Sequence, residues 1–248
     1  MIAVIKKIIN RKLNPYTYSE EAYLNYLREK HVLLGENVKI WSPKTTNIDV
    51  TKPYLIRIGD YVKITQGVTI LAHDYSHSVL RRKFGEFRGG TKPVTIGNNV
   101  FIGMNTTILM GTTIGDDCII GANSLLRGEY PAGSVIAGNP AKIICSVNEM
   151  WDKVTANWID DAVTTARAIY ENKGRQVPTI EEMSDAYVWM YLPRTDEYIE
   201  KYKRFFDLTC DDFEDIKRIF LESEPIFKSY EEFLEYCDFE NTIKETNK

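Results

Sequence analysis

Two of the chain's three histidines, His73 and His77, lie in the stretch ILAHDYSHSVLRRKFGEFRGG, residues 70–90. Imidazole titrates near neutral pH, so either side chain has the chemistry of a general base that takes a proton from an attacking hydroxyl. A positioned base of this kind typically contributes about 10²–10⁴-fold to a rate. His73 is the stronger candidate because a regular repeat in the sequence breaks off there. The plain alternative is a solvent-exposed histidine in a turn.

The residues after His73 add polar and aromatic groups. Asp74 could orient His73 or contact an acceptor, but side chains adjacent in sequence rarely point at each other, so turn capping is the simpler expectation. His77 could contact an acceptor or lie on the plain surface. The segment continues with Arg81, Arg82, Lys83, Phe84, Phe87 and Arg88. This mixture suits either a sugar or its phosphate, or packing of the two phenylalanines against another subunit.

A six-residue repeat surrounds this stretch. Its units read IGDYVK, ITQGVT and ILAHDY before the break, and IGNNVF, IGMNTT, ILMGTT, IGDDCI and IGANSL after it. Each unit begins with isoleucine: Ile58, Ile64, Ile70, Ile96, Ile102, Ile108, Ile114 and Ile120. The fifth position is small or β-branched in all units except the one that holds Asp74. A repeat of this length is typical of a β-helix.

The physical basis is a short strand and a tight turn in each unit, so that three units form one triangular coil. The isoleucines would then point inward and stack, while Gly, Asn and Asp suit the turns. A helix is excluded because a period of six matches no helical face. After His73 the next isoleucine in phase is Ile96, so about twenty residues should leave the coil as a loop over residues 74–93.

The two flanks of the repeat have different patterns. Residues 19–30 predict a helix capped by Ser19, which would cover the open end of the coil. After Cys145 the pattern becomes helical, and Ser146 and Glu149 form a capping box. We therefore expect a helical cap over residues 1–33, a β-helix over 34–145 and an α-helical extension over 146–248.

Charge divides along the chain. Residues 1–145 carry 18 Lys+Arg against 11 Asp+Glu, whereas residues 146–248 carry 13 against 24. The positively charged part, residues 1–145, suits an anionic ligand, but its basic residues are scattered and show no nucleic-acid motif.

The sequence also predicts a location. No apolar run approaches the roughly 20 residues of a membrane span. The start, MIAVIKKIINRK, is no signal peptide; it predicts a short packed helix or one resting on a membrane surface. Four widely spaced cysteines without an export signal predict reduced thiols and the cytoplasm.

Three features together resemble the hexapeptide-repeat acyltransferases with a left-handed β-helix, the group containing galactoside, maltose and polysaccharide O-acetyltransferases. They are the run VTIGNNVFIGMNTTILMGTTIGDDCIIGANSLL, the His73 segment with its loop, and AGNPAKII at residues 137–144. The resemblance covers roughly residues 34–145. It implies a mainly β fold, a homotrimer, acetyl-CoA bound between neighbouring subunits, no metal, and His73 as the general base. The left-handed coil comes from the resemblance alone, since the usual crossover rule favours the other hand.

The resemblance also implies acetyl-CoA contacts. These are backbone groups at Met104, with Asn105 beside it as a candidate acceptor contact, then Ala122, and Lys142 near the phosphates. Ordinary turn residues are the alternative for each. Two positions depart from the family: Phe101 replaces a tryptophan, and Arg127-Gly128 replaces Thr-Lys. Arg127 therefore either supplies that charge on a longer arm, or the CoA tail lies differently.

The leading interpretation is acetyl transfer from acetyl-CoA to a hydroxyl of a sugar or surface-polysaccharide unit. Transfer to the amine of an amino sugar, including a nucleotide-linked one, would use similar chemistry. A zinc lyase of the same shape needs three histidines. Here only His73 and His77 are close, His31 lies outside the repeats, and Asn37 or Trp41 stands where a partner ligand is needed. A non-catalytic scaffold would tolerate loss of His73 and would bind no CoA.

Overall fold

The structure is a computed structural model that describes residues 12–183 and 185–239. The helix predicted at the very start of the chain falls on residues 1–11, outside the described residues, and stays a prediction. The chain divides into two compact units, Met1–Trp151 and Asp152–Lys248. Each unit has its own hydrophobic core.

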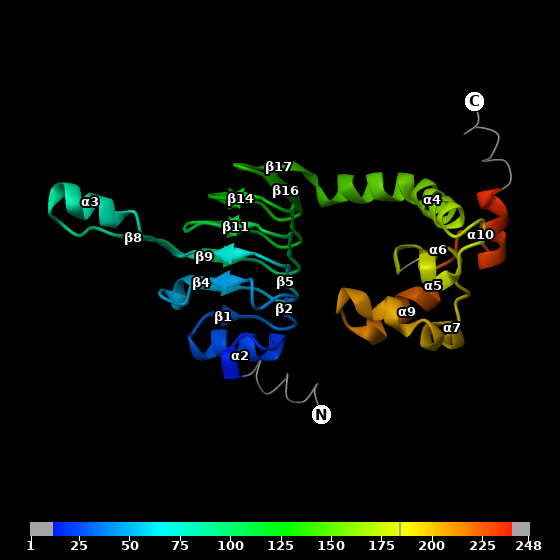
Figure 1. Ribbon diagram of the computed structural model, residues 1–248, viewed down its shortest axis with the longest axis horizontal. Helices are drawn as coiled ribbons and strands as arrows, with labels where there is room; N and C mark the ends of the chain where they lie inside the picture. The colour runs from blue at the N-terminus through cyan, green and yellow to red at the C-terminus, as the bar shows by residue number, and fades with distance from the viewer. Residues whose placement is uncertain (1–11, 184, 240–248) are drawn as a thin grey trace. The chain divides into compact units, whose positions relative to one another are not determined.

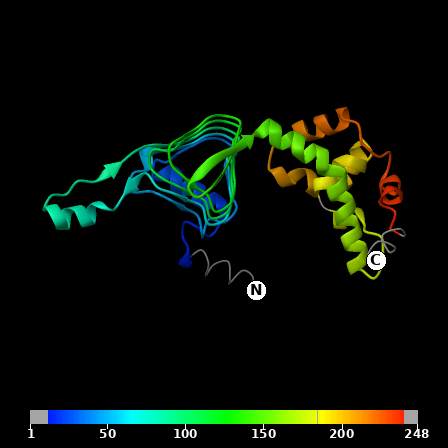
Figure 2. The same cartoon turned by 90° about the horizontal axis from the view of Figure 1, so that it is seen from above.

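The coil of unit 1 consists of short, mostly parallel strands that fall in turn into three sheets (Figure 1). The first sheet holds β1 (Leu33–Leu34), β4 (Ile56–Ile58), β9 (Val94–Ile96), β12 (Thr113–Ile114) and β15 (Glu129–Tyr130). The second holds β2 (Lys39–Ile40), β5 (Lys63–Ile64), β10 (Phe101–Ile102), β13 (Ile119–Ile120), β16 (Ser134–Gly138) and the antiparallel β17 (Ala141–Ser146). The third holds β3 (Asn47–Ile48), β6 (Thr69–Ile70), β11 (Thr107–Ile108) and β14 (Leu125–Leu126). Successive strands visit the three sheets in rotation, which fits the predicted β-helix, and Figure 2 shows the stacked coils in triangular outline.

The register between coils stacks the isoleucines of the repeat. Ile96 pairs with Ile114, one coil later, and with Ile58 across the long break. All eight first-position isoleucines are at most 1% exposed, so their predicted inward orientation is confirmed. Burial of each such side chain contributes about 1.5–3 kcal/mol, so this column is the main stabilising feature of unit 1.

One edge of the coil is held by a ladder of side chains. Asp60 Oδ1 accepts a hydrogen bond from the Glu36 N–H at 2.8 Å, and the Asp60 N–H donates to Asn98 Oδ1 at 2.9 Å. The Asn98 N–H donates in turn to Asp116 Oδ1 at 2.6 Å. Short polar residues therefore satisfy backbone donors at the turns, where strand pairing does not reach.

Helix α2 (Glu20–Glu29) packs on the first coil. The Ser19 side chain accepts from the Ala22 N–H at 3.2 Å, which confirms the predicted cap. Tyr23 and Leu27 are buried in the core of unit 1, and the Tyr23 hydroxyl donates to the Thr46 carbonyl at 3.1 Å. A 3₁₀ turn, η1 (Pro53–Leu55), follows in the next coil.

The break in the repeat forms an arm, residues 73–91, that projects from the coil (Figures 1 and 2). Strands β7 (His73–Asp74) and β8 (Gly90–Thr91) pair antiparallel at its base. Between them lies helix α3 (His77–Phe84), which ends at Gly85 with φ 83°. The sequence predicts a loop here; the helix was not foreseen. Its last turn carries Arg81, Arg82 and Lys83, where positive charge complements the helix dipole.

The second unit is helical. Helix α4 (Val147–Asn172) starts at the predicted capping box: the Ser146 N–H donates to Glu149 Oε2 at 2.7 Å, and the Glu149 N–H donates to Ser146 Oγ at 3.1 Å. The remaining elements are α5 (Ile180–Met183), η2 (Asp185–Tyr187), α6 (Val188–Tyr191), α7 (Asp196–Lys201), α8 (Lys203–Phe206), η3 (Asp207–Thr209), α9 (Phe213–Glu222) and α10 (Tyr230–Cys237). Within the described residues no helix is both long and apolar enough to cross a membrane.

Candidate active site

His73 begins the arm at the corner where the chain leaves the third sheet. Its ring Nδ1 hydrogen-bonds to Oδ2 of Asp49, which directly follows β3 on the preceding coil. The two meet because Ile48 pairs with Ile70, so the residues that follow these two strands lie side by side. Sequence reasoning did not identify Asp49, because this contact runs between coils rather than along the chain.

Asp49 is held on every side. Its side chain is only 2% exposed. Oδ1 accepts from the Thr51 N–H at 2.8 Å and the Thr51 hydroxyl at 2.6 Å, and Oδ2 accepts from the Ala72 N–H at 3.1 Å. Burial by itself would raise the pKa of Asp49, but the hydrogen bonds from Thr51, His73 and Ala72 outweigh it, and the pKa is lowered. The carboxylate is therefore ionised at neutral pH.

This arrangement selects one tautomer of His73. An ionised carboxylate can only accept hydrogen bonds, so Nδ1 carries the proton that points at Asp49. The hydroxyl oxygen of Thr51 lies 3.1 Å from the same nitrogen and helps fix the plane of the ring. Nε2 is then the basic nitrogen. With 26% of its side chain exposed, His73 is accessible to a small molecule.

Two pockets meet at His73. The first, here called the coil pocket, has a volume of about 260 Å³ and is completed by Leu71, Leu109, Met110 and Arg127. The second, the arm pocket, has a volume of about 420 Å³ and is lined by Thr51, Lys52, His77, Phe87, Gly89, Gly90 and Thr91. His73, Asp74 and Tyr75 line both. A base placed between two pockets can serve a reaction with two substrates.

Asp74 and His77 contact each other rather than His73. The Asp74 carboxylate accepts from the Ser76 N–H at 2.7 Å and from the Ser76 hydroxyl at 2.8 Å, and these bonds lower its pKa. The Asp74 carbonyl accepts from His77 Nδ1 at 3.0 Å. Asp74 therefore caps the turn into the arm, and the carboxylate that orients His73 is Asp49.

The residues expected to contact acetyl-CoA do not all lie at the same corner of the triangular coil. Arg127 shares the coil pocket with His73. Met104, Asn105 and Ala122 follow strands of the second sheet and so lie at a different corner, between the second and third sheets. Met104 is 51% exposed, and Asn105 adopts a left-handed turn with φ 58°. Lys142 is exposed on β17. One chain alone thus does not bring this set together with His73.

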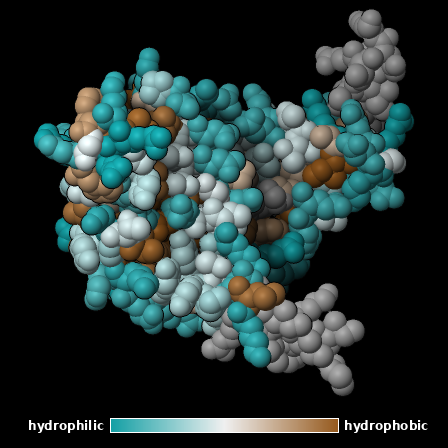
Figure 3. Space-filling view, turned by 60° about the vertical axis from the view of Figure 1, so that its left-hand side comes forward, coloured by the Kyte–Doolittle hydropathy of each residue, from teal (hydrophilic) through white to brown (hydrophobic). Residues whose placement is uncertain are grey.

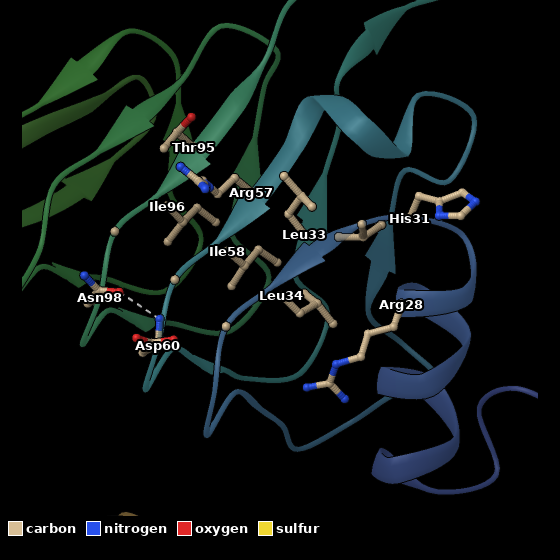
Figure 4. A pocket seen from close by; sticks show the side chains of 14 residues that line it. Arg28, His31, Leu33, Leu34, Arg57, Ile58, Asp60, Thr95, Ile96 and Asn98 are labelled. Atoms are coloured by element: carbon tan, nitrogen blue, oxygen red, sulfur yellow. Dashed lines mark hydrogen bonds between the residues drawn. The ribbon is translucent and has the colours of Figure 1, made fainter.

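A larger pocket, about 700 Å³, lies on the outer face of the first sheet (Figure 4). Arg28 reaches into it from α2, and Arg57 comes from β4. It contains none of the residues that the sequence nominates for chemistry, and its histidine, His31, lies at its edge beside α2 (Figure 4). The larger volume of this pocket alone therefore does not make it the candidate active site. Among the described residues no three His, Cys, Asp or Glu side chains are grouped to hold a metal ion.

Comparison with known proteins decides the family. The family described as bacterial transferase hexapeptide (six repeats) matches residues 93–128. Protein CapG of Staphylococcus aureus is 37% identical over 131 residues, which cover 53% of this chain and 75% of CapG. The chain belongs to the hexapeptide-repeat transferases. The resemblance stated from the sequence is thereby confirmed.

Two further proteins similar to this chain are galactoside acetyltransferases. Galactoside O-acetyltransferase of Escherichia coli K12 is 39% identical over 105 residues, 42% of this chain, and the chain spans about half of that relative's length, 50%. Among solved structures, a galactoside acetyltransferase in complex with coenzyme A is 27% identical and covers 58% of this chain and 82% of its own, with a TM-score of 0.39.

Proposed function

We propose that the protein transfers an acetyl group from acetyl-CoA to a hydroxyl of a sugar or surface-polysaccharide unit, with His73 as the general base. The observation that carries this proposal is the Asp49–His73 pair, which presents Nε2 between two pockets. Membership of the hexapeptide-repeat transferases and the names of the relatives, which include galactoside O-acetyltransferase, support acetyl transfer.

In this proposal acetyl-CoA supplies the acetyl group as a thioester. His73 Nε2 takes the proton of the acceptor hydroxyl while the hydroxyl oxygen bonds to the thioester carbonyl carbon. The carbon–sulfur bond then breaks, and the departing thiolate takes the same proton back from His73. Asp49 stabilises the imidazolium that exists between these two transfers. Every proton is accounted for, and the chain needs no metal for this sequence of steps.

The coil pocket suits the donor and the arm pocket the acceptor. Arg127 lies in the coil pocket and offers a positive charge to the CoA arm. Met104, Ala122 and Lys142 are the other proposed acetyl-CoA contacts, and Asn105 is proposed beside Met104 as an acceptor contact. Since Met104 and Ala122 lie at another corner of the coil from His73, a complete site needs these residues from a neighbouring copy. This supports a site between subunits, as in the homotrimer that the resemblance implies. The left-handed coil is proposed on the resemblance alone.

The remaining parts of the chain receive supporting roles. We propose residues 34–145 as the catalytic domain, residues 1–33 as its cap and residues 146–248 as a helical extension. The cytoplasm is the proposed compartment, because acyl-CoA thioesters are held there and the cysteines are free in the structure.

The test is release of free CoA thiol from acetyl-CoA in the presence of sugars, amino sugars and nucleotide sugars. His73→Ala should lower acceptor-dependent release by about 10²–10⁴-fold. His31→Ala, a histidine away from both pockets, is the matched control and should keep wild-type release. Equal release by wild type and His73→Ala would remove His73 as the base. Preference for amino sugars would move the proposal to N-acetylation. Absence of both release and acetyl-CoA binding would indicate a scaffold.

A further inference from the structure

Aromatic rings form a row along the arm pocket. The rings of Tyr75 and His77 have centroids 4.8 Å apart, and those of His77 and Phe87 are 4.3 Å apart. Tyr75 also meets His73 edge-on at 6.5 Å. The row Tyr75–His77–Phe87, called here the aromatic wall, therefore runs outward from the proposed catalytic base. All three residues line the arm pocket.

The aromatic wall is open to solvent. Tyr75 is 71% exposed and Phe87 is 70% exposed, whereas the first-position isoleucines of the repeat are almost completely buried. Figure 3 shows the side of the protein that carries the arm, where apolar patches lie between strongly polar ones. Exposed aromatic surface that lines a pocket is characteristic of a binding surface rather than of a stabilising core.

Local contacts hold the wall in place without a ligand. The pairs His73–Thr91 and Asp74–Gly90 fix the base of the arm. The hydrogen bond from His77 Nδ1 to the Asp74 carbonyl orients the middle ring. A side chain at Gly89 would place its Cβ 3.2 Å from His77 Nδ1, so glycine there lets the ring lie close against the strand. A wall that is ordered beforehand costs little entropy when a ligand binds.

We propose that the aromatic wall stacks on the apolar face of a sugar ring and selects cyclic sugars over open-chain polyols as acceptors. The negative face of an aromatic ring attracts weakly positive C–H groups, and a pyranose gathers several C–H groups on one face. An open-chain polyol carries the same hydroxyls but presents no such face. The inference rests on the proposed function and adds the substrate class and the residues that recognise it.

The position of the wall fits this role. It adjoins His73 on the arm side, so a ring stacked on Tyr75 holds its hydroxyls beside the basic nitrogen. A volume of about 420 Å³ lies in the range of small-molecule pockets. Lys52 and Thr91 line the same pocket and supply polar groups for the hydroxyls that point away from the base.

The test compares Tyr75→Leu and Phe87→Leu with wild type, and uses Phe84→Leu as the matched control. Phe84 is 67% exposed on the same arm but does not line either pocket at His73. The probes are methyl glucopyranoside and methyl galactopyranoside against glucitol, with acetyl-CoA as donor. We expect each wall variant to raise the KM for the glycosides by about 2–12-fold, and Phe84→Leu to stay close to wild type. Phe87 lines only the arm pocket, so Phe87→Leu should leave the KM for acetyl-CoA unchanged.

A second measurement is independent of turnover. Saturation-transfer NMR with the methyl glycosides should show contact with wild type and Phe84→Leu, and weaker contact with both wall variants. Loss of that contact on the C–H side of the sugar ring identifies stacking directly.

Several outcomes would overturn the inference. They are an unchanged glycoside KM in both wall variants, equal use of glucitol, or no NMR contact between wild type and either glycoside. A fall in sedimentation coefficient in Phe87→Leu but not Phe84→Leu would assign the wall to packing between subunits instead. Failure of the proposed function has a different signature, because His73→Ala would then retain wild-type thiol release whatever the wall variants do.

Discussion

Replacing Asp49 by asparagine tests whether this carboxylate sets the tautomer of His73. The substitution keeps the shape and keeps one oxygen, which can accept from the Thr51 N–H as Oδ1 does. The oxygen that accepts from the Ala72 N–H and faces His73 becomes the amide nitrogen. The substitution removes the negative charge that faces Nδ1, and the new amide can donate to that nitrogen. The proton of the neutral imidazole would then move to Nε2, where it blocks the nitrogen that is proposed to act as the base.

The size of the effect follows from the burial of the pair. A hydrogen bond to a charged group contributes about 1.5–3 kcal/mol, and the Asp49 side chain is only 2% exposed, so solvent screens it little. That range corresponds to a loss of about 10–150-fold in kcat/KM for the acceptor. The loss cannot exceed that of His73→Ala, about 10²–10⁴-fold, because Asp49 acts through His73. The KM for acetyl-CoA should not change.

The assay is steady-state thiol release by Asp49→Asn, His73→Ala and the double variant. The double variant should be no slower than His73→Ala alone, because removing the base leaves nothing for Asp49 to orient. Asp60→Asn is the matched control: Asp60 is also a coil carboxylate that accepts a backbone N–H, but it lies away from both pockets at His73. Asp74→Asn tests the neighbouring carboxylate that contacts Ser76 instead of the base.

Two results with the Asp49 variants would refute this reasoning. One is wild-type kcat/KM in Asp49→Asn with the thermal transition unchanged. The other is a double variant whose loss equals the product of the two single losses, since independent residues multiply and a coupled pair does not. In addition, a larger loss of kcat/KM in Asp74→Asn than in Asp49→Asn would show that Asp74, and not Asp49, orients His73.

Three further predictions concern stability and reactivity. Because the folded-state pKa of Asp49 is below its unfolded value near 3.9, its ionised form stabilises the fold above about pH 4, and this is lost as pH falls further. Urea unfolding should therefore separate wild type from Asp49→Asn at pH 7, and this difference should shrink progressively as the pH is lowered below about 4. Gly97→Ala should destabilise unit 1 by about 1–3 kcal/mol in urea unfolding followed by circular dichroism, because its Cβ would lie 2.5–2.7 Å from atoms of the next coil. Burial raises the pKa of Cys118, and raises that of Cys237 to about 11, so both should resist a thiol reagent at pH 8 until the protein is denatured.

The regular part of unit 1 was predictable because its physics is local. A first-position isoleucine such as Ile102 must point inward in any coil built from six-residue units, and the structure buries it fully. The helix caps at Ser19 and Ser146 were also predictable, since each needs only a polar side chain two or three residues before the N–H it accepts. These features depend on sequence neighbours alone.

Asp49 could not be found in the same way. In regular coils the paired residues are eighteen apart, as Ile96 and Ile114 are. In the first coils Ile48 pairs with Ile70, twenty-two residues later, because η1 inserts extra chain. An alignment of the coils at a constant spacing of eighteen residues therefore places the wrong residue beneath His73. Ile48 is the residue that could have revealed the contact. Once the insertion at η1 is recognised, Ile48 aligns with Ile70, and the next residue, Asp49, then lies beneath Leu71.

The arm shows why chemistry can be added to a repetitive coil at one point. Residues 73–91 leave between β6 and β9, yet Ile70 still pairs with Ile108 and Ile58 still pairs with Ile96. The coils below and above the arm therefore keep their register, and the entropy of closing the arm grows only slowly with its length. The same arrangement places the residues of the candidate site on two different parts of unit 1. Asp49 and the backbone that fixes it belong to the rigid coil, whereas Tyr75 and Phe87 belong to the arm. It follows that the arm can change in sequence, and with it the acceptor, while the coil preserves the geometry of the proposed base.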